Sequence, residues 1–192
     1  MLRNILWSAT KQLKQYSRPY CITQMNKRCR YISTSLTDAD INDTIKKFEN
    51  YKGKFYPSHT FIKIDVRWGD QDAMNHVNNI KYFQFLEQAR VSWFFHSANL
   101  PLSAVEAEIN NVKTLPILAR TEVSYKRPVT YPDTLLIGFS SEATNKSRGD
   151  FKHTYIIYST AQKQVVSTGE ADLVTYDYKD KKRQPVPDDW VF

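Results

Sequence analysis

The sequence predicts an α+β domain in which one long helix packs against an antiparallel sheet. Residues 79–97 have the spacing of a long helix with an apolar face. Five other segments between residues 60 and 177 alternate apolar and polar side chains, as strands with one solvated face do. The chain has 192 residues, which is enough for one such domain with a substantial core and too few for two.

The first elements precede the long helix. Residues 36–58 carry apolar side chains at the spacing of a short helix, followed by a loop with Lys, Tyr and Gly; these side chains are Ala39, Ile41, Ile45 and Phe48. Residues 62–68 then alternate apolar with charged side chains, so we expect the first strand of the sheet there.

The long helix has one strongly apolar face. Tyr82, Leu86, Ala89 and Trp93 follow one another at the spacing of successive helical turns. Three phenylalanines widen this face, namely Phe83, Phe85 and Phe94. A helix this aromatic requires a broad apolar partner, which a curled sheet provides, and the segment 99–101 with its proline ends it.

Four further strands are predicted after the helix, at 115–125, 135–139, 151–159 and 165–175. A Pro-containing turn at 128–133 precedes the second of them, and the polar stretch 144–149 is typical of a hairpin loop. The Lys- and Pro-rich tail is expected to be irregular. The predicted organisation is a leader at 1–35, an extension at 36–58, the domain at 59–177 and a tail at 178–192.

The net positive charge of the chain comes from its first 35 residues. Seven of its 27 Lys and Arg residues lie there with no acidic residue, and the rest of the chain balances its 20 Asp and Glu residues. The seven are Arg3, Lys11, Lys14, Arg18, Lys27, Arg28 and Arg30. The net charge of +7 is therefore no sign of a nucleic-acid-binding domain, and no nucleic-acid partner is expected.

A basic, Ser-rich leader without acids is typical of a mitochondrial transit peptide. The run Arg30-Tyr-Ile-Ser33 resembles a matrix processing site, so we expect a mature protein in the mitochondrial matrix. The alternative is a basic tail on a cytosolic protein. Both cysteines, Cys21 and Cys29, lie in this leader, and the four histidines lack ligand spacing, so neither a metal nor another cofactor is expected. No apolar run is long enough to span a bilayer.

Chemically useful groups converge between the first strand and the long helix. Asp70, Asp72 and His76 are followed at once by Asn78 and Asn79, where the helix begins. A helix N-terminus offers unpaired N–H groups and a partial positive charge to a polarised carbonyl oxygen. A carboxylate, an imidazole and such N–H donors are together the groups needed for attack on an acyl carbon.

This segment, Asp70-Gln-Asp72-Ala-Met-Asn-His76-Val-Asn-Asn79, resembles the Asp-x-Asp-x-x-Gly-His-Val-Asn-Asn run of the hot-dog superfamily. The likeness is to its 4-hydroxybenzoyl-CoA thioesterase-like branch and covers about residues 60–190. Supporting stretches are Glu87-Gln-Ala-Arg90, Tyr125-Lys-Arg-Pro-Val-Thr-Tyr-Pro-Asp133 and Arg183-Gln-Pro-Val-Pro187. The resemblance implies a sheet wrapped around the central helix and an acyl thioester substrate.

The resemblance also implies roles for single residues. Asp72 takes the place of the acid that attacks the thioester or activates water, and the backbone N–H near Asn79 that of the donor to the carbonyl oxygen. His76 matches a catalytic His of the plant acyl-carrier-protein thioesterases. Asn75 stands where many members have Gly, and Met74 where the plant enzymes have an Asn. Their later acidic or thiol partner has no counterpart here.

Each of these residues also has a purely structural interpretation. Asp72 could cap the turn or the helix. A second cap would then be redundant, and we expect Asp70 to be the structural carboxylate of the pair, bound to backbone N–H groups. His76 could be a satisfied turn residue. Glu87 is expected to be solvated or paired with Arg90. Loop cations that could bind the phosphates of a CoA carrier are Lys126, Arg127 and Arg148.

Together these features predict a mitochondrial thioesterase that hydrolyses acyl-CoA or acyl carrier protein substrates. Exposed sheet edges favour a homodimer or homotetramer. Two alternatives remain open: a non-catalytic hot-dog protein in a mitochondrial assembly, and a 3-hydroxyacyl-thioester dehydratase that uses His76 and Asp72.

Overall fold

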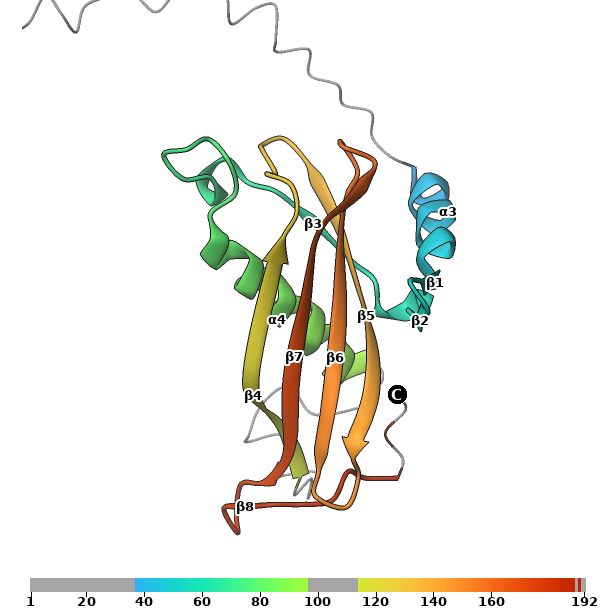
Figure 1. The fold of residues 1–192 in the computed structure, drawn as a ribbon, viewed down its shortest axis with the longest axis vertical. Helices are drawn as coiled ribbons and strands as arrows, with labels where there is room; N and C mark the ends of the chain where they lie inside the picture. The colour runs from blue at the N-terminus through green and yellow to red at the C-terminus, as the bar shows by residue number, and fades with distance from the viewer. Residues whose placement is uncertain (1–36, 97–113, 189, 191–192) are drawn as a thin grey trace, which may run out of the picture. The chain divides into compact units, whose positions relative to one another are not determined.

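A computed structural model describes residues 37–96, 114–188 and 190 (Figure 1). The predicted leader and the segment 99–101 that was expected to end the long helix lie outside the described residues. The compact unit begins at Asp38. None of its described helices is long and apolar enough to cross a membrane.

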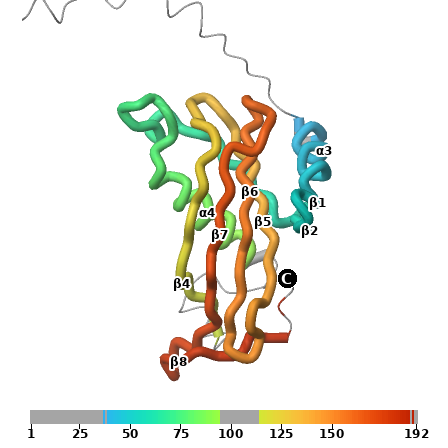
Figure 2. The backbone as a smooth tube through the Cα atoms, viewed as in Figure 1, coloured from blue at the N-terminus to red at the C-terminus, as the bar shows by residue number. Residues whose placement is uncertain are grey.

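An antiparallel sheet forms most of this unit. Its main strands are β3 (Ile62–Asp65), β4 (Thr114–Tyr125), β5 (Thr134–Asn145), β6 (Asp150–Ser159) and β7 (Gln164–Asp177). They lie in the order β3-β5-β6-β7-β4, and the short β8 (Lys182–Arg183) pairs with β7. The strands β4, β7, β6 and β5 run side by side over a long distance (Figures 1 and 2). The α+β fold predicted from the sequence is confirmed.

The helix α4 (Asn79–His96) lies across one face of this sheet. The predicted apolar face is buried, since Tyr82, Leu86, Ala89 and Trp93 are each at most 3% exposed. Gly169 of β7 allows the close approach of the helix, because a Cβ there would lie 2.9 Å from Leu86 Cδ1. The sheet contributes the other half of this core, mainly from Leu135, Ile137, Phe139, Phe151, Tyr155, Ile157 and Leu173.

The extension before the sheet forms its own small elements. The helix α3 (Asp38–Phe48) occupies the stretch where a short helix was predicted. A two-stranded hairpin follows, β1 (Asn50–Tyr51) and β2 (Lys54–Phe55), where only a loop was expected. The 3-10 turn η1 (Ser58–Thr60) then fixes the chain to the sheet, because Thr60 Oγ1 donates to the Phe139 carbonyl at 2.9 Å.

Several predicted boundaries need correction. The first strand ends at Asp65 rather than at residue 68, because the chain turns into the 3-10 element η2 (Trp68–Asp70). The second strand after the helix runs to Asn145, well beyond residue 139. Phe83 is 39% exposed and does not widen the buried helix face.

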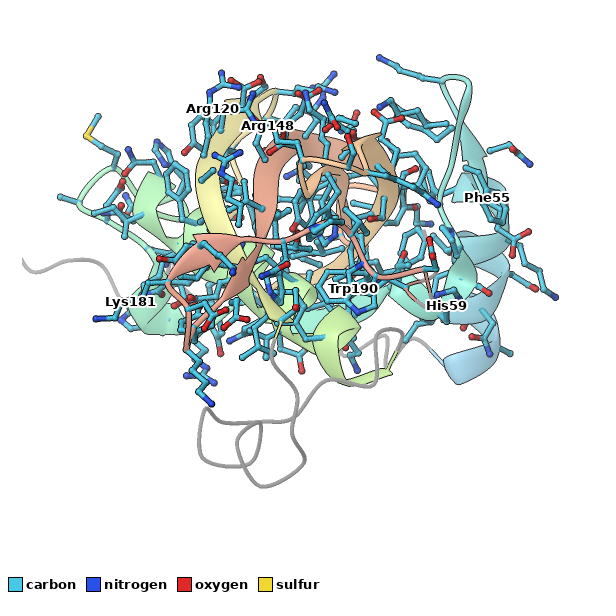
Figure 3. All side chains as sticks on the ribbon, turned by 90° about the horizontal axis from the view of Figure 1, so that it is seen from below. Phe55, His59, Arg120, Arg148, Lys181 and Trp190 are labelled. Atoms are coloured by element: carbon cyan, nitrogen blue, oxygen red, sulfur yellow. The ribbon has the colours of Figure 1, made fainter. Side chains whose placement is uncertain are left out.

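The tail was expected to be irregular, and this is wrong for the part that forms β8. Lys182 and Arg183 form β8 on the end of β7. Residues 184–187 and Trp190 belong to no helix or strand, yet Trp190 is buried. Trp190, labelled in Figure 3, is 6% exposed and packs edge-on against Trp93 at a ring distance of 5.8 Å. Its ring covers apolar side chains at the end of the core, which is sufficient reason for the tail to be fixed.

A polar group lies inside the core. His153 of β6 is fully buried and stacks on Phe139, with ring centroids 4.7 Å apart. Its Nδ1 is 3.1 Å from the Tyr155 hydroxyl, whereas Nε2 has no partner among the described residues. Burial, and secondarily the charge of Arg90, lowers the pKa of His153 to about 3. The imidazole is therefore neutral at physiological pH.

Candidate active site

Asp70 fixes the loop between β3 and α4. Its Oδ2 accepts the Arg67 N–H at 2.8 Å, and its Oδ1 lies 3.3 Å from Lys81 Nζ. Its carbonyl accepts the Asn78 N–H at 2.9 Å, directly before the helix. Asp70 is buried, so these contacts make it the structural carboxylate of the pair, as predicted from the sequence.

Asp72 and His76 face each other across a tight turn. The Asp72 N–H donates to the His76 carbonyl at 3.0 Å, and the Asn75 N–H donates to the Asp72 carbonyl at 3.1 Å. Asn75 has φ 61°, a left-handed conformation that Asn adopts more readily than most residues. Asn75 therefore adopts the left-handed conformation at the position where the family pattern has Gly.

The Asp72 carboxylate has one oxygen in this turn and one outside it. Its Oδ1 accepts the Met74 N–H at 2.8 Å and so stabilises the turn locally. Its Oδ2 is 3.8 Å from His76 Nδ1, longer than a hydrogen bond. The Asp72 side chain is 27% exposed, so the second oxygen is accessible for chemistry.

The N-terminus of α4 leaves one donor unused. Asn78 caps the helix, since its Oδ1 accepts the Ile80 N–H at 3.0 Å and its carbonyl accepts the Lys81 N–H at 2.9 Å. Among the described residues, the Asn79 N–H has no acceptor. It points from the positive end of the helix dipole and is available to an oxyanion.

These groups line a hollow of about 420 Å³ together with the end of β4. The loop contributes Asp72 and His76, and α4 contributes Asn79 and Tyr82. The remaining lining residues are Val77, Tyr125, Lys126, Arg127 and Pro128. One wall thus carries a carboxylate, an imidazole and a helix N-terminus, and the other carries two cations.

Two tyrosines connect these walls. The Tyr125 hydroxyl donates to the Asn79 carbonyl at 3.3 Å, and the Tyr82 and Tyr125 rings meet edge to face at 5.0 Å. Burial raises the pKa of Tyr82 to about 12, with smaller contributions from Tyr125 and Asp133. Both phenols keep their protons near neutral pH. The sequence places Tyr82 on the apolar helix face, and nothing in the spacing indicated that it lines a site.

Five of the six predicted site residues share this hollow, namely Asp72, His76, Asn79, Lys126 and Arg127. Arg148 does not. It follows β5 at the end of the sheet where Thr114 of β4 begins, whereas Lys126 follows the opposite end of β4. Its Nε lies 3.2 Å from Asp150 Oδ2, and Figure 3 labels it next to Arg120. Within one subunit, Arg148 is therefore an ion-paired hairpin residue.

Glu87 is outside the hollow as well. Its side chain is 64% exposed, and its Oε1 lies 3.8 Å from Arg90 Nη2. This is the solvated, Arg-paired position expected from the sequence. Within the described ranges, no group of three or more His, Cys, Asp or Glu side chains is placed to bind a metal ion.

Comparison with known families assigns the chain to a class. The family model for the thioesterase-like superfamily matches residues 66–191, so the chain belongs to this superfamily. The match begins directly before the loop of Asp70 and Asp72 and includes all six predicted site residues. The extension with α3, β1 and β2 lies outside it.

Individual relatives agree with this assignment. The PA2801 protein of Pseudomonas aeruginosa is 26% identical, with a TM-score of 0.54, over 67% of this chain and 92% of that one. YbaW of Escherichia coli, a probable thioesterase, is 26% identical, with a TM-score of 0.51, over 66% and 90% of the two chains. A 1,4-dihydroxy-2-naphthoyl-CoA thioesterase from Synechocystis shares the fold at 20% identity, with a TM-score of 0.56, over 67% and 90%.

One curated relative is the uncharacterized protein YsmA of Bacillus subtilis, 26% identical over 100 residues. The match covers 52% of this chain and 60% of YsmA, so this chain spans less than two thirds of that relative.

Proposed function

We propose that this protein hydrolyses acyl-CoA thioesters to the free acid and CoA. One observation carries the proposal: a carboxylate oxygen of Asp72 and the free Asn79 N–H line the same hollow. The first can deliver a nucleophile and the second can stabilise the oxyanion that the attack creates. Membership of the thioesterase-like superfamily supports this chemistry.

In the proposed reaction, the thioester carbonyl oxygen accepts the Asn79 N–H. Asp72 removes a proton from a water whose oxygen bonds to the carbonyl carbon, and the negative charge that develops on the carbonyl oxygen lies at the helix N-terminus. Collapse of this intermediate breaks the C–S bond and releases the thiolate, which regains a proton. Direct attack by the carboxylate would form an anhydride that water then opens. A thiolate is a good leaving group, so few catalytic groups suffice.

The cationic wall of the hollow fits the carrier part of the substrate. Lys126 and Arg127 follow β4 directly, and the N–H groups of both donate to the Val166 carbonyl, at 2.9 and 3.1 Å. This shared acceptor holds the backbone of both cations at the rim. Guanidinium and ammonium groups bind phosphates well, and CoA supplies phosphates remote from its thioester.

A second copy of the chain is expected to complete the protein. The twelve-residue strand β4 is the last strand of the sheet order, so its outer edge has no partner strand among the described residues. A long edge of this kind is normally paired or covered. We propose a dimer formed at β4, whose end also contributes Tyr125 to the hollow. Sedimentation analysis that finds a monomer at micromolar concentration would contradict it.

The basic leader supports a mitochondrial location, with cleavage near residue 33 on import. The N-terminal sequence of the protein isolated from mitochondria tests this, since an intact Met1 would contradict cleavage.

The activity itself is tested by thiol release from a panel of acyl-CoAs of increasing chain length, with acyl carrier protein thioesters in parallel. We expect turnover on a subset of acyl chains. Absence of turnover on every thioester would favour the non-catalytic alternative. Hydration of 2-enoyl-CoA without thiol release would instead favour the dehydratase alternative.

A further inference from the structure

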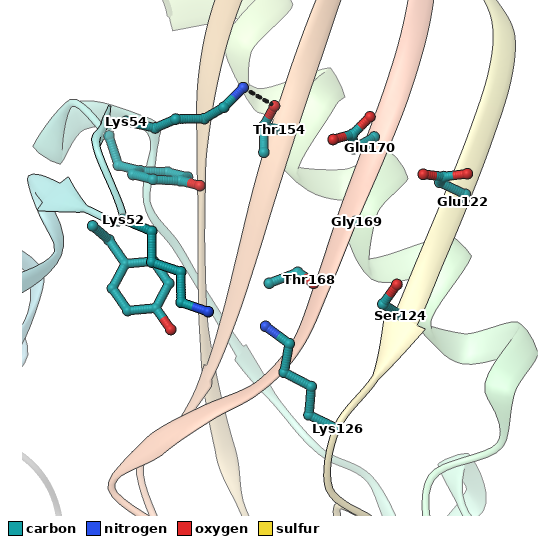
Figure 4. Close-up of a pocket in the computed structure, with 11 residues that line it drawn as sticks. Lys52, Lys54, Glu122, Ser124, Lys126, Thr154, Thr168, Gly169 and Glu170 are labelled. Atoms are coloured by element: carbon teal, nitrogen blue, oxygen red, sulfur yellow. Dashed lines mark hydrogen bonds between the residues drawn. The ribbon is translucent and has the colours of Figure 1, made fainter.

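A second hollow, of about 270 Å³, lies on the face of the sheet opposite α4. Figure 4 shows its lining side chains in front of the strands, with the helix behind them. Its floor consists of cross-strand neighbours, because Ser124 of β4 pairs with Thr168 of β7 and Glu122 pairs with Glu170. Lys126 follows the end of β4 at Tyr125 and lines the same hollow.

The opposite wall of this outer hollow comes from the β1–β2 hairpin. The hairpin is fixed over the sheet by Lys54, whose Nζ donates to Thr154 Oγ1 at 3.0 Å. Its two-residue turn, Lys52-Gly53, has φ 51° and 76°, the signs of a type I′ turn. Asn, Asp or Gly is preferred at the first of these positions, so a Lys there is held in an unfavourable backbone conformation.

Most charges in the outer hollow neutralise one another. Glu170 accepts a hydrogen bond from Lys152 at 2.9 Å, Glu122 pairs with Arg120, and Lys54 lies 3.7 Å from Glu142. The exceptions are Lys52 and Lys126. Neither has a carboxylate within ion-pair distance among the described residues.

These two lysines without a carboxylate partner point toward one another, beside Thr168 (Figure 4), and Lys52 Nζ also lies 5.6 Å from the centroid of the Tyr51 ring. Burial, and secondarily the charge of Lys52, lowers the pKa of Lys126, as expected when two like charges converge. An arrangement that brings two ammonium groups together without a counter-ion is stabilised by an anion between them. Lys126 also lines the hollow that contains Asp72, so the two hollows meet at this residue.

We propose that Lys52 and Lys126 form a phosphate-binding site in the outer hollow for the carrier of the thioester substrate. The inference rests on the proposed thioesterase function and extends it. In CoA, and in the phosphopantetheine of a carrier protein, the phosphate and the thioester lie at opposite ends of the pantetheine arm. A carrier whose phosphate lies between the lysines can therefore direct its thioester past Lys126 toward Asp72. The hairpin outside the superfamily match thus supplies a substrate contact.

The test uses the full chain and measures CoA binding by calorimetry, beside kcat and KM for acyl-CoA and for the phosphate-free acyl-pantetheine. Lys52→Asn removes the charge and places a residue that suits the turn, so the hairpin is preserved. Lys181→Asn is the matched control, because Lys181 also has a left-handed φ, 53°, and lies far from Phe55 of the hairpin (Figure 3).

We expect Lys52→Asn to weaken CoA binding about tenfold, the loss expected for one charge-assisted phosphate contact. The ratio of kcat/KM for acyl-CoA to that for acyl-pantetheine falls by the same factor. The change appears as a higher KM for acyl-CoA, with kcat unchanged. Lys126→Gln gives the same result and Lys181→Asn gives none. Competition by adenosine 3′,5′-bisphosphate assigns the site to the CoA nucleotide. A Lys52 dependence seen only with a phosphopantetheinyl carrier protein assigns it to that carrier.

Two results separate this inference from the proposed function. Binding and KM for both carriers, CoA and the phosphopantetheinyl carrier protein, that are equal in Lys52→Asn and the unmodified chain would overturn the phosphate site even if hydrolysis is normal. The same effect in Lys181→Asn would also overturn it. No binding of either carrier to the unmodified chain would overturn it too. CoA binding that depends on Lys52 and Lys126, without turnover of any thioester, would instead refute the proposed hydrolase activity and support the phosphate-binding site.

Discussion

Asp72→Asn is the substitution that separates catalysis from structure in the candidate site. The amide keeps the size of the carboxylate, and its oxygen can still accept the Met74 N–H that Asp72 Oδ1 accepts at 2.8 Å. The turn up to His76 should therefore remain. The other oxygen, 3.8 Å from His76 Nδ1, becomes an NH₂ group that is neither nucleophilic nor basic.

The expected magnitudes follow from these contacts. Loss of a general base lowers kcat by about 10²–10⁴, which corresponds to roughly 3–5 kcal/mol of transition-state stabilisation. The free energy of unfolding changes by less than about 1 kcal/mol, because the backbone hydrogen bond survives and the contact with the exposed His76 is weak. Thiol release and thermal unfolding of the same preparation measure both quantities.

Asp70→Asn is the matched control, two residues away in the same loop. Its amide oxygen can still accept the Arg67 N–H, but Lys81 loses its buried anionic partner at 3.3 Å. We expect a loss of about 1–2 kcal/mol in stability and a change in kcat of less than about threefold. Near-normal turnover by Asp72→Asn would refute the assignment of Asp72 as the catalytic acid.

Three further predictions concern the fold. Buried His153 is neutral with a pKa of about 3, against about 6.5 when unfolded, so the unfolded chain binds the extra proton and stability falls as pH drops from 6.5 toward 3. Urea unfolding should show a slope of up to about 1.4 kcal/mol per pH unit there, which His153→Phe removes. Gly149→Ala should destabilise by roughly 1–3 kcal/mol in the same assay, since φ is 87° and the added Cβ would overlap the Gln184 carbonyl oxygen. Trp190→Ala should cost about 3 kcal/mol, because it uncovers Trp93; an unchanged melting temperature would show that the tail contributes nothing to the core.

Most of the fold could be predicted because its periodicities are strong. The four apolar residues of the α4 face follow a regular spacing, and all four are buried. The errors arose where tertiary contacts override the local pattern. The 62–68 alternation continues to Trp68, yet the strand ends at Asp65, because Asp70 binds the Arg67 backbone and turns the chain away. Trp190 follows a polar tail, so the local sequence does not predict its burial. It is buried because its ring covers the end of the core, which would otherwise be exposed.

The candidate site was predictable as far as it is local in sequence. Asp72, His76 and Asn79 lie within eight residues, so a turn and a helix start bring them together whatever the rest of the chain does. Lys126 and Arg127 also line the hollow, because they follow Tyr125 at the end of β4, whose hydroxyl contacts Asn79 at the start of α4. Positive charge alone predicts the same role for Arg148, whereas strand register places Arg148 at the other end of the sheet.

Lys52 marks the limit of reasoning from sequence alone. Lys52, Lys163 and Lys181 all have φ between 51° and 53°, so a left-handed lysine by itself is not evidence of a site. What distinguishes Lys52 is its position opposite Lys126, which depends on the pairing of β4 with β7 and on the packing of the hairpin against the sheet. No spacing within residues 50–55 carries that information. The proposed phosphate site therefore depends on a juxtaposition of residues 74 positions apart, and the comparison of Lys52→Asn with Lys181→Asn tests that juxtaposition rather than the charge or the turn alone.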